Sequence, residues 1–233
     1  MILLWYIFSS LAVAASLGAA TLSGQVELAD SREASVSKQK DYSGIVVWLE
    51  PVAQPAPLAK IGNFTMVQKN KRFLPHVLVI PVGSTVNFPN SDPIFHNAFS
   101  NFSGQPFDTG LYPPGTSHKV RFRREGVVRV FCNIHSNMSA VIVVVNSPYF
   151  ASTAKDGKFR LDGVAPGEYK LRVWHERASE KTLDSLQQKL IVEGDRKLPP
   201  LRISESGYLE VPHKNKHGQE YPPADRTYTG APK

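Results

Sequence analysis

The sequence predicts an all-β protein built from β-sandwiches. Short segments along the chain alternate apolar and polar residues with a period of two, which is the pattern of a strand with one buried face. Glycine and proline separate these segments at close intervals. No segment has a convincing amphipathic helical pattern, and residues 180–190 are only a weak candidate. Many short strands joined by glycine- and proline-containing turns are typical of β-sandwiches.

The first 20 residues form an uncharged, apolar run that ends in small residues. This composition predicts a signal peptide for export, with cleavage after Ala20, because Gly18 and Ala20 are both small. The Lys or Arg that usually precedes the apolar stretch is missing, and about 20 apolar residues can also span a bilayer. An uncleaved membrane anchor is therefore the alternative, and it is the one membrane attachment that we expect.

Two segments in the middle of the chain predict further strands. Residues 73–90 form two strands around a turn at Gly83–Ser84, and the prolines within them restrict these strands to edges or strand ends. Residues 118–124 alternate, with Val120 and Phe122 on the inward face.

The next two segments place the single cysteine of the chain. Residues 127–132 alternate, so Val130 and Cys132 share the buried face if Arg129 faces solvent. Residues 140–145 form an unbroken apolar run, which is typical of a strand covered on both faces. Cys132 therefore lies at the inward end of a strand.

A second unit lies at residues 156–176, where two alternating strands are accompanied by turns at Asp156–Gly157 and Pro166–Gly167. This unit resembles the latter half of a carboxypeptidase-regulatory-like, or transthyretin-like, β-sandwich. Residues 22–30 and 42–51 resemble the first half of such a domain. The resemblance implies that distant parts of the chain belong to one sandwich.

If they do, residues 60–146 are a domain inserted between the two parts of that sandwich, residues 22–59 and 147–204. Insertions are tolerated where their ends lie close together at a loop tip. Two sequential domains with a short N-terminal extension are the alternative. The last stretch, residues 205–233, is polar, contains proline and has no periodicity, which predicts a flexible tail.

The chain has a net charge of +7, to which the apolar N-terminal run contributes nothing. Net charge bears on solubility and association and not on fold. For an exported protein we expect no nucleic acid as partner, and an acidic protein or an anionic surface fits better. A basic surface that only keeps the protein soluble is the alternative.

Cys132 has no second cysteine with which to form a disulfide within the chain. An exposed free thiol would be open to oxidation in an exported protein. A metal site or a buried core position would protect it, and composition alone does not choose between the two.

The segment "CNIHSNM" places Cys132, His135 and Met138 in one short loop between two predicted strands. A mononuclear copper site for electron transfer needs two imidazoles and a thiolate in a trigonal plane, with a weak axial thioether. His96, in "FPNSDPIFHNAFS", can supply the second imidazole. These four side chains are the candidate ligands of one copper ion.

The motif Cys-x2-His-x2-Met, preceded by a separate His-Asn, resembles the blue-copper cupredoxins, with a ligand loop closest in length to that of amicyanin. The resemblance covers residues 60–146 and implies a Greek-key β-sandwich. It also implies that His96 is the buried imidazole, Cys132 the thiolate, His135 the more exposed imidazole and Met138 the axial ligand. Asn97 would tie the two ligand loops together.

With its second sandwich, the whole chain resembles bacterial methylamine-utilisation-like proteins that carry a plastocyanin-like domain. One position departs from the cupredoxin pattern. Amicyanin and plastocyanin have proline just before the second histidine, where this chain has Ile134. A less rigid ligand loop is expected, with consequences for the axial distance and the reduction potential.

Other interpretations of the cysteine and histidine residues remain open. Zinc could take the same imidazole and thiolate ligands, although a thioether suits it poorly. A Cys–His hydrolase dyad usually comes from distant parts of a chain, and a dinuclear copper centre would need a second cysteine. The structural alternative makes Cys132 and Met138 core residues and His135 a turn residue.

The remaining histidines weigh less as metal ligands. His76 is predicted to be a strand residue, with an accessory metal role as the alternative. His118 and His175 are expected on exposed, basic strands, and His213 and His217 in the solvated tail.

A redox centre also needs a surface for its partner. Apolar loop residues would either form a patch around the exposed His135 or pack against the second sandwich: Pro93, Ile94, Phe95, Tyr112, Pro113 and Pro114. Arginines on neighbouring strands are expected to lie on either side of the path by which a partner reaches His135, and to steer an acidic partner: Arg121, Arg123, Arg124 and Arg129.

The sequence thus predicts an exported, monomeric blue-copper protein that transfers single electrons to a redox protein partner and is not an enzyme. The second sandwich would serve as a scaffold or docking module. A copper-holding or copper-delivery protein without a redox partner is one alternative. A surface-binding module with a purely structural metal is the other.

Overall fold

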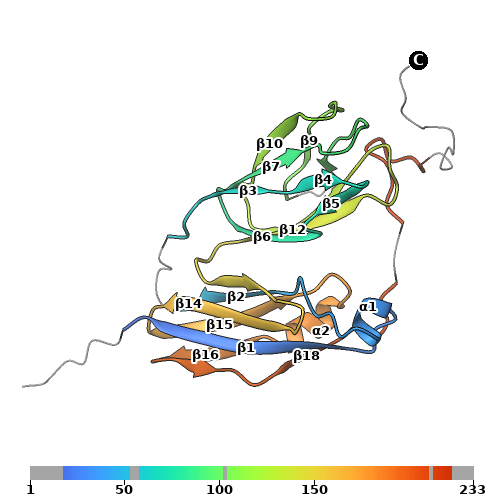
Figure 1. Ribbon diagram of the computed structural model, residues 1–233. Helices are drawn as coiled ribbons and strands as arrows, with labels where there is room; N and C mark the ends of the chain where they lie inside the picture. Colours follow the sequence, from blue (N-terminus) through green and yellow to red (C-terminus); the bar gives the residue numbers. More distant parts are fainter. Residues whose placement is uncertain (1–17, 53–57, 102–103, 210–211, 222–233) are drawn as a thin grey trace, which may run out of the picture.

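The computed structural model of the protein describes residues 18–52, 58–101, 104–209 and 212–221. Most of the predicted signal peptide and the end of the predicted tail lie outside these residues, so export and anchoring stay predictions. The described part is all-β, as predicted, and consists of two stacked sandwiches (Figure 1). None of its helices has the length and apolar character needed to cross a membrane.

The first sandwich has two sheets and a hairpin. One sheet has the order β10-β7-β3, and the other has the order β6-β12-β11-β8-β9. Their bounds are β3 Asn63–Thr65, β6 Val77–Pro81, β7 Thr85–Pro89, β8 Phe99–Ser100, β9 Phe107–Asp108, β10 Ser117–Arg121, β11 Gly126–Phe131 and β12 Ser139–Val145. The hairpin is formed by β4 (Val67–Lys69) and β5 (Arg72–Leu74). Buried side chains from both sheets, such as Phe88, Phe122 and Ile142, form one core that also includes Cys132 and Met138.

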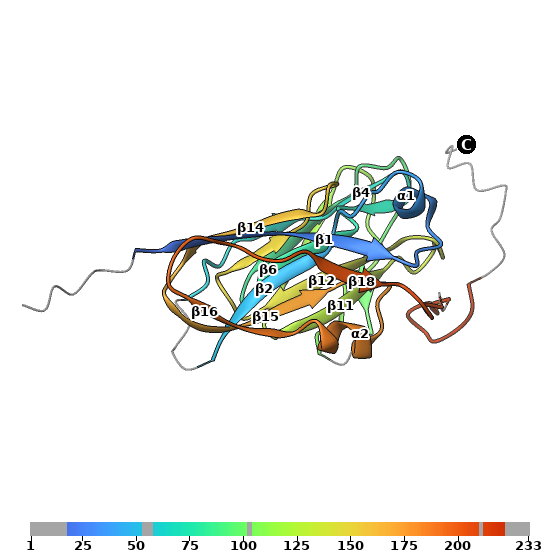
Figure 2. The same ribbon diagram turned by 90° about the horizontal axis from the view of Figure 1, so that it is seen from below.

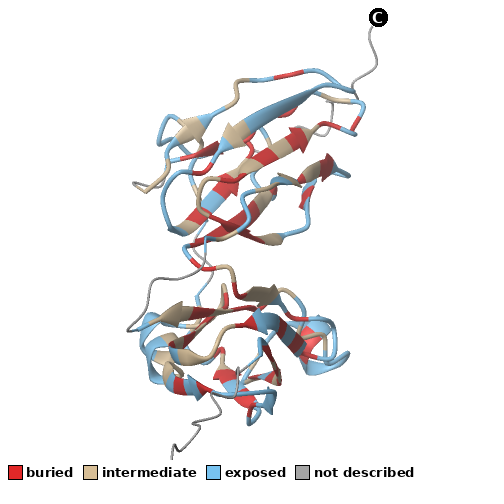
Figure 3. Ribbon diagram, turned by 90° about the vertical axis from the view of Figure 1, so that its left-hand side faces the viewer, coloured by how far each residue is buried: buried red, intermediate tan, exposed pale blue. Residues whose placement is uncertain are grey.

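The second sandwich is assembled from strands that precede and strands that follow those of the first sandwich. One sheet has the order β13-β2-β15-β16, and the other is built around β1, which pairs with β14, β17 and β18. Their bounds are β1 Ala20–Ala29, β2 Val46–Pro51, β13 Phe150–Ser152, β14 Lys158–Val164, β15 Gly167–Trp174, β16 Gln188–Val192, β17 Arg196–Lys197 and β18 Leu201–Ser204. Buried positions alternate with exposed ones along many of these strands, as the period of two requires (Figure 3).

Strand pairing shows how the two sandwiches share the chain. The early strands β1 and β2 pair only with β13 and later strands, whereas the strands between residues 63 and 145 pair only among themselves. An insertion would produce this arrangement. The turn at Asp156–Gly157 joins β13 to β14, and Gly157 has a φ of 75° there. A Cβ on Gly157 would lie 2.0 Å from the carbonyl oxygen of Val26, so only glycine fits.

The two sandwiches meet sheet against sheet, and they overlie each other when seen from below (Figure 2). Between them lies a separate apolar cluster that includes Val46 on β2 and Val141 and Val143 on β12. The neighbouring residues Ala140 and Ile142 of β12 face the core of the first sandwich. The unbroken apolar run of β12 is thus explained, because both faces of this strand are covered.

Two short helices complete the described structure: α1 spans Ala34–Ser37 and α2 spans Glu180–Ser185. The weak helical pattern at 180–190 therefore corresponds to a single short helix followed by β16. Ser179 caps α2 by accepting a hydrogen bond from the backbone N–H of Thr182.

Candidate metal centre

Three of the four predicted ligands converge at one end of the first sandwich. The Sγ of Cys132 lies 3.8 Å from Nδ1 of His96 and 3.6 Å from Nδ1 of His135. The three donor atoms all lie within 4.8 Å of one another. His96 and Cys132 are buried and His135 is half-buried. Within the described residues this is the one cluster of three or more potential metal-binding side chains.

These distances fit a shared metal ion. For metal–nitrogen and metal–sulfur bonds of about 2.1 Å and about 2.3 Å at a trigonal angle of about 120°, the two donor atoms lie ~3.8 Å apart. The two Cys–His distances are close to this value. A thiolate with two imidazoles is also the donor set that suits copper in electron-transfer proteins. The residues present therefore fit a copper ion.

The loop that carries Cys132 and His135 is closed by its own backbone. The N–H of Cys132 donates to the carbonyl of Met138 (3.1 Å), and the N–H of Met138 donates to the carbonyl of His135 (3.1 Å). Met138 is fully buried in the same core as Cys132. The loop therefore holds Met138 beside the end of the cysteine strand.

Asn97 connects the two loops that carry the candidate ligands. The backbone N–H of Asn133 donates to Oδ1 of Asn97 (2.7 Å), and Nδ2 of Asn97 donates to Oδ1 of Asp108 (3.1 Å). Asn97 is fully buried. Because Asn97 follows His96 and Asn133 follows Cys132, these bonds hold the two ligand segments in register.

A buried carboxylate orients the first imidazole. Nε2 of His96 lies 2.8 Å from Oδ2 of Asp92. The same carboxylate accepts hydrogen bonds from the backbone N–H groups of Asn70 (2.6 Å) and Lys71 (2.8 Å). An Asp92 carboxylate that accepts from Nε2–H leaves Nδ1 of His96 as the unprotonated donor facing Cys132.

Burial sets the protonation of the donors in the absence of metal. It lowers the pKa of His96, against the opposing effect of Asp92, and lowers the pKa of His135 to about 4. Burial also raises the pKa of the Cys132 thiol, while backbone N–H groups of Asn97, Ile134 and His135 oppose that rise. Both imidazoles are thus neutral at neutral pH and can donate to a metal, which would in turn displace the thiol proton.

Three exposed apolar residues stand next to residues of the metal end in the chain. Phe95, Leu111 and Ile134 are 46%, 55% and 40% exposed, and we call these three the apolar rim. Phe95 precedes His96, Ile134 precedes His135, and Leu111 precedes Tyr112, whose backbone exchanges two hydrogen bonds with that of His96. None of the three belongs to the cluster between the sandwiches.

The six apolar loop residues predicted near this end divide between surface and core. Pro93, Phe95, Pro113 and Pro114 are exposed, Ile94 is half-buried and Tyr112 is buried. The hydroxyl of Tyr112 donates to the carbonyl of Phe88 (2.8 Å) and accepts from the side chain of Gln68. Tyr112 therefore supports the loop from inside and takes no part in the surface.

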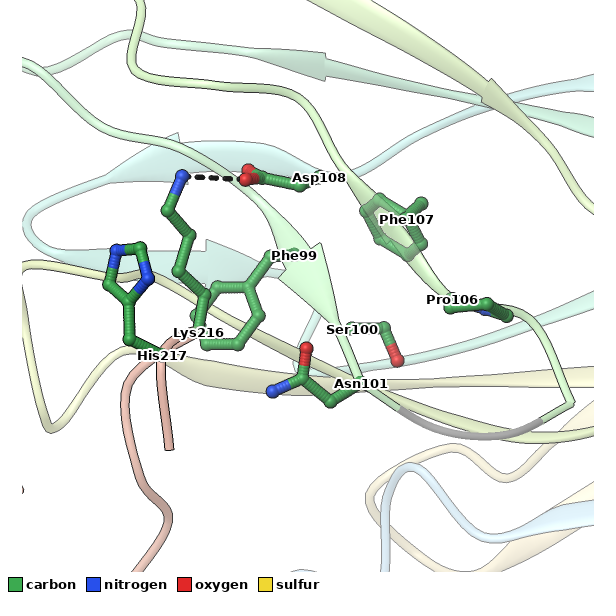
Figure 4. Close-up of a pocket in the computed structure, with 8 residues that line it drawn as sticks. All are labelled: Phe99, Ser100, Asn101, Pro106, Phe107, Asp108, Lys216 and His217. Atoms are coloured by element: carbon green, nitrogen blue, oxygen red, sulfur yellow. Dashed lines mark hydrogen bonds and ion pairs between the residues drawn. The ribbon is translucent and has the colours of Figure 1, made fainter. Parts of the chain in front are cut away.

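The C-terminal segment returns to the metal end, which the prediction of a flexible tail did not anticipate. Residues 212–221 contain no helix or strand, yet the hydroxyl of Tyr221 donates to the carbonyl of Cys132 (2.7 Å). The N–H of Lys216 donates to Oδ1 of Asn133 (3.0 Å), and its Nζ pairs with Asp108 at 2.7 Å. Figure 4 shows Lys216 and His217 beside β8 and β9, around a shallow hollow.

Several histidines differ from their predicted settings. His213 is half-buried, with its ring stacked on Phe131 at 4.0 Å, where a solvated tail residue was expected. His175 is buried and lies 2.6 Å from Glu205, where an exposed strand residue was expected. His118 and His217 are exposed. His76 is exposed and pairs with Glu176 of the other sandwich, away from the three-residue cluster.

The predicted arrangement of arginines around the metal end is wrong. Arg121 pairs with Thr85 at the start of β7, and its Nε donates to the carbonyl of Gly83. The turn at Gly83 lies at the opposite end of the sandwich from the loop between β11 and β12. Arg123 and Arg124 come just after β10, next to Phe122, whose backbone is hydrogen-bonded to this turn. Arg129 has its charge paired with Glu176 (3.2 Å). The alternation of β10 revealed which side chains are exposed, but not which end of the sheet they occupy.

Two parts of the site were missed in the sequence. Asp92 stands four residues before His96, and a carboxylate so close to a candidate ligand was the available signal. For the segment 212–221 the sequence offered no periodicity, and its aromatic and basic residues were the one indication of a contact.

Comparisons with known proteins match part of the chain. No protein-family model and no curated protein matches it. Among solved structures it is similar to a copper-containing nitrite reductase from Thermus scotoductus SA-01, with 31% identity over 41% of this chain and a TM-score of 0.35. The match spans a quarter of that enzyme's length.

A purple cupredoxin from Nitrosopumilus maritimus is similar at 26% identity over 36% of this chain and 99% of its own, with a TM-score of 0.33. A mutant of amicyanin is similar at 15% identity over 42% and 99%, with a TM-score of 0.34. These matches to copper proteins extend over about two fifths of the chain. The resemblance of the second sandwich to carboxypeptidase-regulatory-like domains stays a prediction.

Proposed function

We propose that the protein is an exported, mononuclear blue-copper protein that transfers single electrons. His96, Cys132 and His135 would hold the ion, and Met138 would be the weak axial ligand. Bound copper would supply one-electron redox chemistry by cycling between Cu(I) and Cu(II). The protein would act as a monomer and as a carrier, with the second sandwich as its scaffold.

One observation carries this proposal: a buried thiol and two neutral imidazoles converge at distances that suit one ion. Rigid placement favours electron transfer, because donors that are already in position need little rearrangement when the charge of the ion changes. Asn97 and Asp92 provide this placement through hydrogen bonds to the two ligand loops. The apolar rim would let a partner approach His135 closely, since it is easily desolvated.

The visible spectrum of the purified protein with Cu(II) tests the proposal. Charge transfer from a Cys132 thiolate to Cu(II) should give an intense blue or purple colour and a reversible one-electron potential. Cys132→Ser should remove the colour, and Asn137→Ser, at an exposed position of the same loop, should keep it. A Cys132→Ser protein that keeps the colour would exclude this site.

The same measurements separate the alternatives. A delivery protein would bind Cu(I) and pass it to an acceptor without reversible cycling. A structural metal would be required for folding, so that the metal-free protein would lose its β-structure. A colourless protein that binds zinc tightly would replace the copper assignment by a zinc site.

A further inference from the structure

Close to the apolar rim lies a cluster of positive charge at the tip of the β4–β5 hairpin. Lys69, Lys71 and Arg72 are all exposed, and we call these three the basic turn. None of them forms an ion pair with another residue in the described ranges. Their charges are therefore available to a partner.

The backbone of this turn is in a rarely used conformation. Lys69 and Arg72 pair with each other across the hairpin, so Asn70 and Lys71 form a two-residue loop with φ values of 55° and 53°. A loop with two positive φ values usually contains glycine, and a lysine there carries a conformational cost. Asp92 offsets this cost, because its carboxylate accepts the backbone N–H groups of both loop residues.

The same carboxylate joins the basic turn to the metal centre. Oδ2 of Asp92 receives Lys71 N–H at 2.8 Å and lies 2.8 Å from Nε2 of His96. The negative charge of Asp92 is thereby engaged in the interior, and the lysine and arginine charges remain outside.

We propose that the basic turn and the adjacent apolar rim form one docking surface for an acidic redox protein. The inference rests on the proposed function, because it names the partner of that same site. The rim supplies a surface that desolvates easily next to His135, and the turn supplies the charge that steers and orients an anionic partner. This surface replaces the arginines of β10 and the segment after it, which lie at the other end of the same sandwich.

The basic turn and the arginine cluster, by which we mean Arg121, Arg123 and Arg124, lie near opposite ends of β7. Gln68, which precedes the basic turn, bridges to Asn90 just beyond the end of β7, whereas Arg121 pairs with Thr85 at its start. Reversing three charges in either cluster changes the net charge of the protein by the same amount. The arginine cluster is therefore a matched control for the basic turn.

Electron transfer to small ions of opposite charge tests the proposal. The reduced protein gives one electron to ferricyanide, which becomes ferrocyanide, or to tris(phenanthroline)cobalt(III), which becomes cobalt(II). At an ionic strength of about 0.1 M, where the Debye length is about 10 Å, Lys69→Glu with Lys71→Glu and Arg72→Glu should slow the reaction with the ferricyanide anion several-fold. The same variant should accelerate the reaction with the cobalt cation. The control, Arg121→Glu with Arg123→Glu and Arg124→Glu, should change either rate by no more than about twofold, since screening limits its reach.

A second measurement does not depend on copper. Poly-glutamate added to the metal-free protein should shift the amide NMR signals of residues 69–72 and of the rim, and should leave residues 121–124 unchanged. Equal rate effects of the two triple variants, or shifts at 121–124 in place of 69–72, would overturn the proposed surface. A protein without redox activity that still shows the shifts at 69–72 would overturn the proposed function and leave the anion-binding surface standing.

Discussion

Each sandwich of this protein contains a buried histidine paired with a carboxylate, and the two pairs differ in what surrounds them. His96 and Asp92 in the first sandwich lie 2.8 Å apart, and His175 and Glu205 in the second lie 2.6 Å apart. All four residues are buried. The chemical groups and distances are thus similar in the two places.

The surroundings give the two pairs different capacities, and we call His175–Glu205 the closed pair and His96–Asp92 the open pair. Glu205 also accepts hydrogen bonds from Arg177 and Ser31, so a cation neutralises it and the cluster ties together the ends of β1, β15 and β18. Asp92 is stabilised by two backbone N–H groups, and the far nitrogen of its histidine faces a thiol. A His–carboxylate pair alone is therefore not a functional site. The thiol and the second imidazole beside the free nitrogen of His96 are what make the first pair a candidate metal site.

The largest expected effect comes from the closed pair. Glu205→Gln removes a buried charge and leaves the Arg177 cation without its partner. Loss of one member of a buried ion pair costs about 3 to 5 kcal/mol of unfolding free energy. Urea denaturation would measure this, with Glu27→Gln, at an exposed position of β1, as the control. The copper spectrum should remain unchanged, and a near-neutral Glu205→Gln protein would contradict the structural role.

Acid should weaken the same cluster. Hydrogen bonds from His175, Arg177 and Ser31 overcome the effect of burial and lower the pKa of Glu205 to about 2, from an unfolded value of 4.5. A lowered pKa stabilises the fold above the unfolded value, and this stability is lost as pH falls from about 4.5 to about 2. The shift corresponds to about 3 kcal/mol. Wild-type stability should fall more steeply than that of Glu205→Gln in this range, and parallel curves would refute the assignment.

The open pair should affect the metal more than the fold. Asp92→Asn retains an oxygen that can accept from Nε2 of His96 but removes the negative charge that increases the basicity of the imidazole. Such changes beside a ligand typically lower metal affinity by about 10- to 100-fold. Competition with a Cu(II) chelator would measure it, and Asp156→Asn, at an exposed turn of the second sandwich, is the control. An unchanged affinity would show that Asp92 only supports the basic turn.

What the sequence could predict follows from how local each feature is. Cys132, His135 and Met138 belong to one loop, so their spacing alone indicated a site, and the alternation of β11 placed Cys132 on the buried face. His96 lies far from this loop in the sequence, and it was identified because a copper site needs a second imidazole, while its role as the buried one came from the resemblance to a family pattern. Asp92 depends on a contact with the β4–β5 turn about twenty residues earlier, which alternation does not reveal.

The same limit explains the misplaced arginines and the C-terminal segment. A period of two assigns Arg121 and Arg129 to an outer face, but strand direction decides which end of the sheet Arg121 occupies. The packing of a second sandwich then covers the face on which Arg129 lies. Residues 212–221 form no regular element, so their contacts with Cys132 and Asn133 arise from single hydrogen bonds that no periodic pattern indicates.

Tyr221 provides a smaller test of how the C-terminal segment supports the metal loop. Tyr221→Phe removes the hydroxyl that donates to the Cys132 carbonyl and keeps the ring beside His213. The net loss of one hydrogen bond costs about 1 kcal/mol. Thermal unfolding of the metal-free protein would detect it, while Tyr42→Phe, in the second sandwich, serves as the control. A larger loss together with a changed copper spectrum would mean that the segment shapes the ligand geometry itself.

The smallest effect is expected at a third His–carboxylate pair, which joins the two sandwiches at the surface. Nε2 of His76 lies 2.6 Å from Glu176, which also pairs with Arg129 at 3.2 Å. The side chain of His76 is half exposed, so solvent screens the pair, and Glu176→Gln should cost less than about 1 kcal/mol.

The pH dependence of this third pair distinguishes it from the closed pair. The hydrogen bond to Glu176 raises the pKa of His76 above its ordinary 6.5. A raised histidine pKa gives stability that is fully present below pH 6.5 and is lost as pH rises through the folded value. The wild-type protein should therefore lose a small part of its unfolding free energy above neutral pH, and Glu176→Gln should lose none there. If Glu176→Gln instead weakens the fold as strongly as Glu205→Gln, exposure does not distinguish the pairs, and the interface between the sandwiches is as essential as their cores.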